Sequence, residues 1–320
     1  MQTLKYVIKR LVLMVVVFFI IMTICFTLIR LLEPEVSPGV AGQLELEQRE
    51  ARGYNEPILV QYGIYLKNIF TKWDFGTSWE IDYGQPVTNV IGSRLLPTVL
   101  LNIFSLLISV PIGIGLGMFA ALKKNKWQDS FISTLVMIFI SVPSYVYAFL
   151  LQYQLGFKLG LFPIVLSSLY DAGGSWFSGE MLNSMVLPVM ALSFGTIASL
   201  TRFTRAELTE ALTSEYMLLA RAKGLTKGQA TFRHALKNAM VPILPTIISL
   251  FINIMSGAII IEKIFAVNGI GQLYLKSISL LDYDVFMATS MFYTIISLGG
   301  AIIVDLSYGF LDPRIRMGAK

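Results

Sequence analysis

Residues able to do covalent or metal chemistry are scarce in this sequence of 320 amino acids. The chain has one histidine, His234, and one cysteine, Cys25, which lies in an apolar run. A single cysteine forms no disulfide within the chain, and the sequence offers no cysteine-histidine set with metal-ligand spacing. The phosphate-binding pattern G-x-x-x-x-G-K-[ST] is also missing, because residues 224–228 lack its spacing and its final Gly-Lys pair. We therefore expect no catalytic residue, no metal site and no cofactor in this chain.

Asp305 is the one ionisable residue well inside a predicted membrane span. Carboxylates within spans are usually functional, but Asp305 lies near one end of its span. A role in translocation and a structural role are therefore both open. Gly113 and Gly117, in an earlier span, fit a helix-contact pattern of small residues, and we expect them to serve packing.

Residues 202–242, here called the basic segment, are polar yet lie between two apolar runs. Ser214 is a favourable N-cap, and Glu215 follows it in the first turn, where the helix dipole favours an acid. Gly224 suits a left-handed C-cap, with Leu225 folding back on the last turn. The pattern therefore predicts a short helix that ends at a glycine turn.

A second helix follows directly. Thr226 and Gln229 have the spacing of a capping box, and the helix is expected over 227–240 until Pro242. DNA binding by such a helix-turn-helix is disfavoured, because both flanks run into membrane spans. A solvated loop and a docking element for another protein remain, and a protein groove would accept a short helix with an apolar side. Here that side is made of Tyr216, Met217, Leu219 and Ala220.

The composition indicates that these helices belong to a membrane protein. The chain is 55% hydrophobic and only 14% charged, whereas soluble domains have about 25% charged residues. Six apolar runs approach or exceed the roughly 20 residues needed to span a bilayer: 11–29, 95–122, 131–157, 182–201, 243–261 and 286–310. The first has no small-residue cleavage site and is interpreted as a retained anchor. Pro111 and Pro143 are expected to kink or break the second and third.

The charges of the connecting segments indicate the orientation. Every second segment is basic, namely the N-terminus, 123–130, the basic segment and the tail after 310. Because basic segments stay on the cytoplasmic side, both termini and the basic segment are expected in the cytoplasm. The net charge of +5 is thus mostly a topology signal and no indication of nucleic-acid binding.

Three segments are expected outside, namely 30–94, 158–181 and 262–285, and two of them are too long to be simple turns. The first, 30–94, is predicted to mix a short helix with turns over 67–79. The second, 262–285, has a turn signal at 267–271, followed by an amphipathic stretch over 272–281. The expected organisation is an anchor helix with a long outer loop (1–94), a five-helix core containing the basic segment (95–310) and a cytoplasmic tail (311–320).

Four groups of residues carry a family resemblance. In the basic segment they are Glu215, Tyr216, Ala220, Arg221, Ala222, Lys223, Gly224, Leu225, Arg233, His234 and Asn238, with Pro242. The first outer loop has Asp74, Phe75, Gly76, Thr77 and Ser78. The second outer segment has Glu262, Lys263, Ile264 and Phe265, then 269–271, then Asp282 and Tyr283. The end of the chain has Asp305, Leu306 and 311–316. Together these resemble the permeases of ABC importers, and more narrowly the B-type subunit of oligopeptide and dipeptide permeases; Tyr216 replaces the alanine of the generic motif.

The resemblance implies an all-α integral membrane protein with six transmembrane helices and the type I ABC importer permease fold. It implies an ATPase-coupling role for the basic-segment residues above and a possible outside-partner role for residues 74–78. The implied partners are a second homologous permease chain, two cytoplasmic ABC ATPases that use ATP and magnesium, an extracytoplasmic substrate-binding protein and the lipid bilayer of a bacterial cytoplasmic membrane.

The expected cargo is a dipeptide or oligopeptide, with nickel or another small solute left open. An ion-coupled secondary carrier is disfavoured, because it would need several polar groups at the membrane midplane and often inverted repeats. A membrane-bound scaffold or receptor with a cytoplasmic docking loop is a further alternative.

Overall fold

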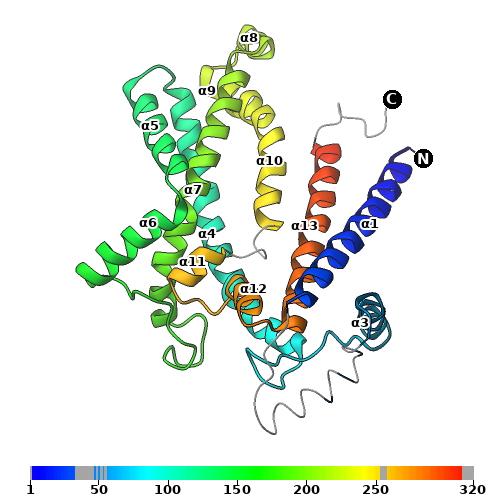
Figure 1. Cartoon of the computed structure of the whole chain (residues 1–320). Helices are drawn as coiled ribbons and strands as arrows, with labels where there is room; N and C mark the ends of the chain where they lie inside the picture. The colour runs from blue at the N-terminus through cyan, green and yellow to red at the C-terminus, as the bar shows by residue number, and fades with distance from the viewer. Residues whose placement is uncertain are drawn as a thin grey trace. The chain divides into compact units, whose positions relative to one another are not determined.

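The structure, a computed structural model, describes residues 2–32, 47, 50, 53, 56–252 and 258–311, and in these it is helical apart from turns and loops (Figure 1). The described residues contain no strand, and one isolated bridge joins Thr77 and Pro86. Residues 312–316, part of the C-terminal resemblance, lie outside the described residues. The elements in chain order are α1 (Gln2–Arg30), α3 (Ile58–Lys72), α4 (Val87–Leu122), α5 (Trp127–Ser141), α6 (Ser144–Leu151), the π-helix η1 (Gln152–Lys158), α7 (Gly179–Leu212), α8 (Glu215–Ala222), α9 (Lys227–Ala230), the π-helix η2 (Thr231–Ala235), α10 (Leu236–Ile252), α11 (Ile259–Ile264), α12 (Ile270–Ser279) and α13 (Tyr283–Leu311).

The chain divides into two compact units. Unit 1 comprises Met1–Thr98, Met255–Ile259 and Asn268–Gly299. Unit 2 comprises Val99–Ile254, Ile260–Val267 and Gly300–Lys320. The organisation expected from the sequence, with boundaries at 94 and 310, stays a prediction.

Five described helices are long and apolar enough to cross a membrane, and a bent pair makes six if it counts as one span. The five are Val7–Arg30, Val87–Leu122, Gly179–Leu212, Lys227–Ile252 and Tyr283–Ser307. The bent pair is Trp127–Ser141 with Ser144–Lys158, and the two parts meet at 98°. The all-helical membrane fold predicted from the sequence is therefore confirmed, with its third span broken.

Prolines account for the main differences from the expected spans. Pro143 is the N-cap of α6 and lies at the 98° bend, so the predicted break is present there. Pro111 breaks nothing, because α4 continues from Val87 to Leu122. The predicted helix end at Pro242 is wrong, because α10 contains both Pro242 and Pro245 and ends at Ile252. In an apolar span the remaining backbone groups have no water to bind, so the helix continues across its prolines.

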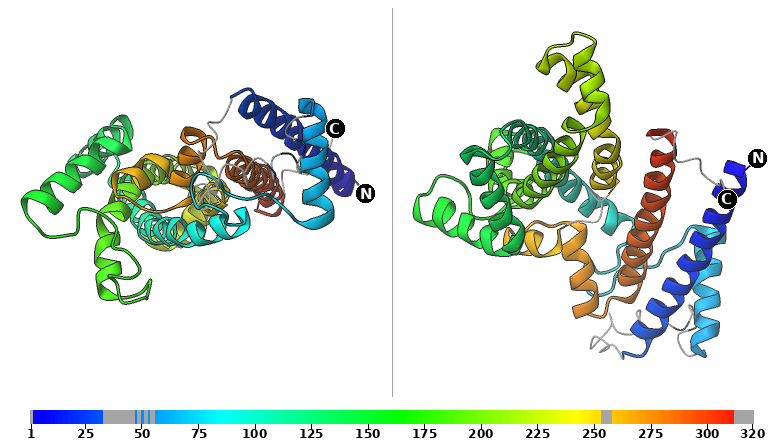
Figure 2. Two further views of the ribbon diagram at one scale, coloured as in Figure 1. Left: turned by 60° about the horizontal axis from the view of Figure 1, so that its bottom comes forward. Right: turned by 90° about the horizontal axis from the view of Figure 1, so that it is seen from above.

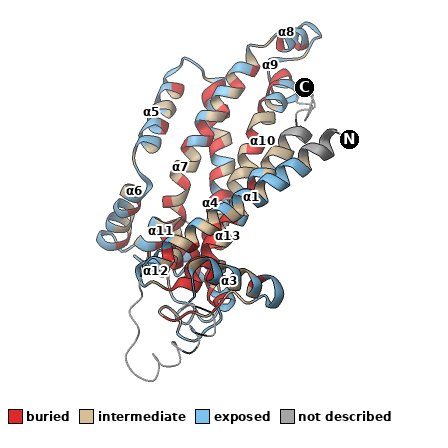
Figure 3. Ribbon diagram, turned by 45° about the vertical axis from the view of Figure 1, so that its right-hand side comes forward, coloured by how far each residue is buried: buried red, intermediate tan, exposed pale blue. Residues whose placement is uncertain are grey.

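Unit 2 is built around α7, which has buried residues along most of its length (Figure 3). Helix α4 packs tightly against it at two glycines. A Cβ added at Gly113 would lie 2.7 Å from the Cβ of Leu200, and one at Gly117 would lie 2.6 Å from the Cβ of Thr204. The packing role predicted for Gly113 and Gly117 is therefore confirmed.

Unit 1 has two apolar clusters. In the first, Phe26 of α1 packs against Tyr65 of α3, with ring centroids 5.6 Å apart, and Phe286 of α13 belongs to the same cluster. In the second, α4 meets α12 and α13 through buried apolar residues including Val90 and Leu273. The mixture of helix and turns expected over 67–79 is found, because α3 ends at Lys72 and loop and turns follow it, but the helix begins earlier than expected, at Ile58. The amphipathic stretch predicted at 272–281 is found as helix α12.

Candidate functional site

Helix α8 ends at Ala222, and Gly224 follows it in the left-handed conformation that the sequence predicts. Gly224 has φ +91°, and no atom lies within 4 Å of the position its Cβ would occupy. Its N–H donates to the carbonyl of Arg221 at 3.0 Å, and the N–H of Leu225 donates to the carbonyl of Ala220 at 3.3 Å. These two bonds make up a Schellman turn, which pairs the last free carbonyls of the helix.

The start of α8 differs from the prediction in one contact. Ser214 occupies the N-cap position with extended backbone, as expected, but its side chain accepts no hydrogen bond from α8. Its hydroxyl instead donates to the carbonyl of Ala211 at 2.6 Å, near the end of α7. Ser214 therefore joins α8 to the end of α7, and only Thr213 and Ser214 separate the two helices.

Helix α9 begins with the predicted capping box. The hydroxyl of Thr226 accepts from the N–H of Gln229 at 3.3 Å, and the Gln229 side chain accepts from the N–H of Thr226 at 3.1 Å. The chain then passes through the π-helix η2 into α10, and the side-chain amide of Asn238 donates to the carbonyl of His234 at 3.0 Å. Helix α8 thus follows α7 after residues 213 and 214, and α9 passes through η2 into α10 without a gap. Both α7 and α10 belong to candidate membrane spans (Figure 2).

An alanine-rich cluster holds the helix pair in place. Most of its members are alanines, which let helices pack closely together. The buried members come from the ends of α4 and α7 and from α8, α9, η2 and α10. They are Ala121, Leu208, Ala211, Met217, Ala220, Ala230, Ala235 and Ala239, with Leu225 packed against them.

The outward face of the helix pair combines apolar and basic side chains. Met217 and Ala220 point into the cluster, so the apolar side predicted for α8 is only half exposed. Leu218 and Phe232, which the sequence analysis passed over, are 66% and 69% exposed. For Leu218 the signal is the helical spacing, because burial of positions 217 and 220 turns 218 and 219 outward. Phe232 lies in η2, where Thr231 and Ala235 are the buried residues. The exposed apolar, lysine and arginine residues of 215–237 are Tyr216, Leu218, Leu219, Arg221, Ala222, Lys223, Lys227, Phe232, Arg233 and Lys237. Such a surface has the chemistry of a docking face.

Residues 74–78, predicted as a possible contact for an outside partner, bind the start of α13 within unit 1. The hydroxyl of Ser78, which is fully buried, donates to Oδ2 of Asp282 at 2.6 Å. The N–H groups of residues 79–81 donate to the same oxygen at 3.1–3.2 Å. The N–H of Thr77 donates to Asp284 Oδ2 at 3.1 Å. We call these contacts the Asp282 latch.

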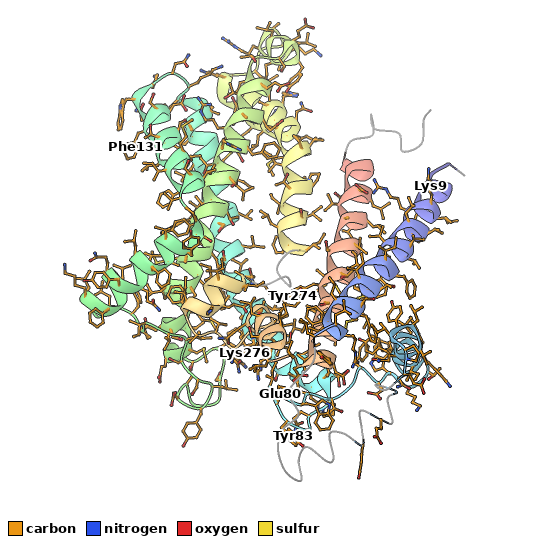
Figure 4. All side chains as sticks on the ribbon, in the orientation of Figure 1. Lys9, Glu80, Tyr83, Phe131, Tyr274 and Lys276 are labelled. Atoms are coloured by element: carbon orange, nitrogen blue, oxygen red, sulfur yellow. The ribbon has the colours of Figure 1, made fainter. Side chains whose placement is uncertain are left out.

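The latch requires a glycine beside Asp284. Gly76 has φ +101°, and a Cβ there would lie 2.3 Å from the carboxyl group of Asp284. Glu80 and Tyr83, labelled in Figure 4, belong to the turn that continues from the latch. Residues 74–78 and Asp282 lie far apart in the sequence, and nothing in their spacing indicates that they meet.

Asp305 lies in α13 and is half-buried. Among the described residues, no group of three or more His, Cys, Asp or Glu side chains has the arrangement of a metal site. The roles proposed for Asp305 from the sequence stay open predictions.

Comparisons with known proteins agree on one class. Residues 113–317 match the model of a family described as binding-protein-dependent transport system inner membrane component. The chain is 36% identical over 319 residues to the dipeptide transport system permease protein DppB of Lactococcus lactis, covering 98% of this chain and 99% of the relative. It is 35% identical to DppB of Bacillus subtilis, covering 99% of each chain. It is 33% identical to the oligopeptide transport system permease protein OppB of Salmonella typhimurium, covering 98% of this chain and 99% of the relative.

Two solved structures share the fold. A crystal structure of an amino acid ABC transporter with histidines aligns with TM-score 0.52 and 19% identity, over 70% of this chain and 94% of that chain. An inward-facing structure of the MetNI methionine ABC transporter aligns with TM-score 0.51 and 16% identity, over 69% of this chain and 97% of that chain.

Proposed function

We propose that this chain, which belongs to the family of binding-protein-dependent transport system inner membrane components and is a permease subunit of an ABC importer in the bacterial cytoplasmic membrane, carries peptides. We also propose that a partner ATPase drives transport by moving helix α8. The cargo proposal is supported by relatives that match over nearly the whole chain and are named as dipeptide or oligopeptide permeases. Nickel or another small solute is the alternative cargo.

The observation that carries the coupling role is the exposed face of the helix pair. Tyr216, Leu218, Leu219 and Phe232 are exposed on short helices whose inner sides are fixed in the alanine-rich cluster. A helix whose inner side is packed against its own chain and whose outer side is exposed and apolar suits a groove in a partner protein. The partner we propose is an ABC ATPase that binds ATP and magnesium, with the helix pair facing the cytoplasm.

The complete importer would contain this chain, a second homologous permease, two ATPases and an external substrate-binding protein. ATP binding would close the ATPase pair and draw the two α8 helices together. The spans would then open outward to the docked binding protein, and hydrolysis would reset them. In this cycle the present chain transmits force and lines the path, and it makes or breaks no covalent bond.

Reconstitution of the complex in proteoliposomes tests the coupling role. Leu219→Asp places a charge on the docking face, so we expect it to abolish both the ATPase activity stimulated by the binding protein and peptide uptake. Trp127→Asp is the matched control, because Trp127 is 73% exposed and lies in 123–130, a segment expected on the same side of the membrane but outside the basic segment. Equal activity of the two variants would refute docking through α8.

The cargo is tested separately in the wild-type complex. Uptake of labelled dipeptides, longer peptides and nickel is compared under the same conditions. Peptide accumulation that depends on ATP supports the proposal, whereas nickel accumulation without peptide uptake refutes it.

A further inference from the structure

Two charged residues of unit 2 form a bidentate ion pair between α5 and α7. Nε of Arg205 lies 2.5 Å from Oδ1 of Asp129, and Nη2 lies 2.8 Å from Oδ2. The side chain of Asp129 is 5% exposed and that of Arg205 is 32% exposed. The N–H of Asn125 donates to Oδ2 at 3.1 Å, and the hydroxyl of Ser133 is 3.5 Å from Oδ1. Both oxygens of the carboxylate are therefore held in a fixed geometry.

Such a pair is better suited to fixing a geometry than to stabilising a fold. Removing a carboxylate and a guanidinium from water is costly, and their mutual attraction often does no more than offset this cost. The planar guanidinium, however, fixes the mutual orientation of the two groups. Asp129 also lies in the first turn of α5, where the helix dipole favours an acid. The pair thus joins the first turn of α5 to one defined position on α7.

That position is close to the docking helix. Arg205 lies seven residues before Leu212, the last residue of α7, which is roughly 10 Å along the helix. On the α4 side, Thr204 is in tight contact with Gly117, so α7 has little freedom to slide along α4. The end of α7 is therefore held by α4 and α5 immediately before the chain enters α8.

We propose that the Asp129–Arg205 pair is the mechanical link through which movement of α8 reaches α5 and the bend at Pro143. Rings of Phe139 and Tyr147, on either side of the bend, also pack on Phe194 of α7, with centroids 5.0 and 5.7 Å away. Without the ion pair, the first turn of α5 loses its fixed position on α7, so movement of α7 reaches the 98° junction between α5 and α6 less completely. Phe131, labelled in Figure 4, lies in α5 two residues after Asp129. The inference rests on the proposed coupling role of α8, and both residues act as positioning residues without contacting cargo.

The test uses the complete importer in proteoliposomes and compares ATP hydrolysis with peptide uptake. Asp129→Asn and Arg205→Gln each break the ion pair. We expect both variants to keep the ATPase activity that the binding protein stimulates. The amount of peptide taken up per ATP should fall about fivefold or more, which is the size of typical coupling between distant sites. Arg202→Gln is the matched control, because Arg202 is an exposed arginine on the same helix.

The charge swap, Asp129→Arg with Arg205→Asp, separates linkage from folding. If the pair transmits movement, the swap restores uptake per ATP toward the wild-type value although both residues have changed. Uptake and ATPase activity that fall in proportion in the single variants, or a swap that stays uncoupled, would overturn the inference. Failure of the coupling proposal itself has a different signature, because Leu219→Asp would then leave stimulated ATPase activity unchanged.

Discussion

Substitution of Gly224 tests whether the turn after α8 must be formed for transport. With φ +91° and nothing within 4 Å of the missing Cβ, Gly224→Ala adds no clash, and its effect is purely conformational. A side chain in the left-handed region costs about 1–2 kcal/mol, and the lower entropy of the unfolded chain returns about 0.4–1 kcal/mol. The net cost is about 1 kcal/mol, which lowers the equilibrium constant for closing the turn about fivefold.

Other substitutions at Gly224 extend the series. Asparagine tolerates the left-handed region better than alanine, so Gly224→Asn is expected to lose less. Proline fixes φ near −65° and removes the N–H that bonds the Arg221 carbonyl, so Gly224→Pro is expected to abolish the turn. The predicted order of activity is therefore glycine, asparagine, alanine, proline.

The assay is ATPase activity stimulated by the binding protein, measured with peptide uptake in proteoliposomes. Gly228→Ala is the matched control, since Gly228 lies in helix α9, also has open space around it and has no positive φ. That control should keep wild-type activity. Wild-type uptake by Gly224→Pro, or equal losses at positions 224 and 228, would refute the argument that this turn carries force.

Two further predictions concern packing within each unit. In unit 2, Gly117→Ala places a Cβ 2.6 Å from that of Thr204 and should lower the free energy of unfolding by about 1–3 kcal/mol. The control Gly115→Ala, with open space around it, should leave the melting temperature unchanged. Equal melting temperatures of the two variants would contradict the close packing. In unit 1, Asp282→Asn removes the charged oxygen that accepts four hydrogen bonds and should speed hydrogen exchange at the amides of residues 79–81. The control Asp171→Asn, at an exposed site, should not change that exchange. Unchanged exchange at 79–81 in Asp282→Asn would refute the latch.

Local signals in the sequence predicted the helix pair well because its ends are decided by neighbouring residues. The left-handed Gly224 and the capping box of Thr226 and Gln229 depend on atoms at most a few positions apart, and both are confirmed. The same local reasoning was wrong at Pro242, where a rule that holds in water predicts a helix end. In an apolar span the unpaired backbone groups decide the outcome, and the helix continues.

The contacts that sequence reasoning missed join residues far apart in the chain. The latch links Ser78 to Asp282 across 204 positions, and the ion pair links Asp129 to Arg205 across 76. A carboxylate at the start of a helix has an adequate local reason to be there, because the helix dipole favours it. Asp129 and Asp282 therefore carry no sign in the sequence that a distant partner also requires them. For this reason substitution of one partner alone is ambiguous, since it disturbs the helix start as well as the long-range contact. The charge swap at 129 and 205 resolves the ambiguity, because it worsens the helix start while restoring the pair, and recovery of uptake can then come only from the pair.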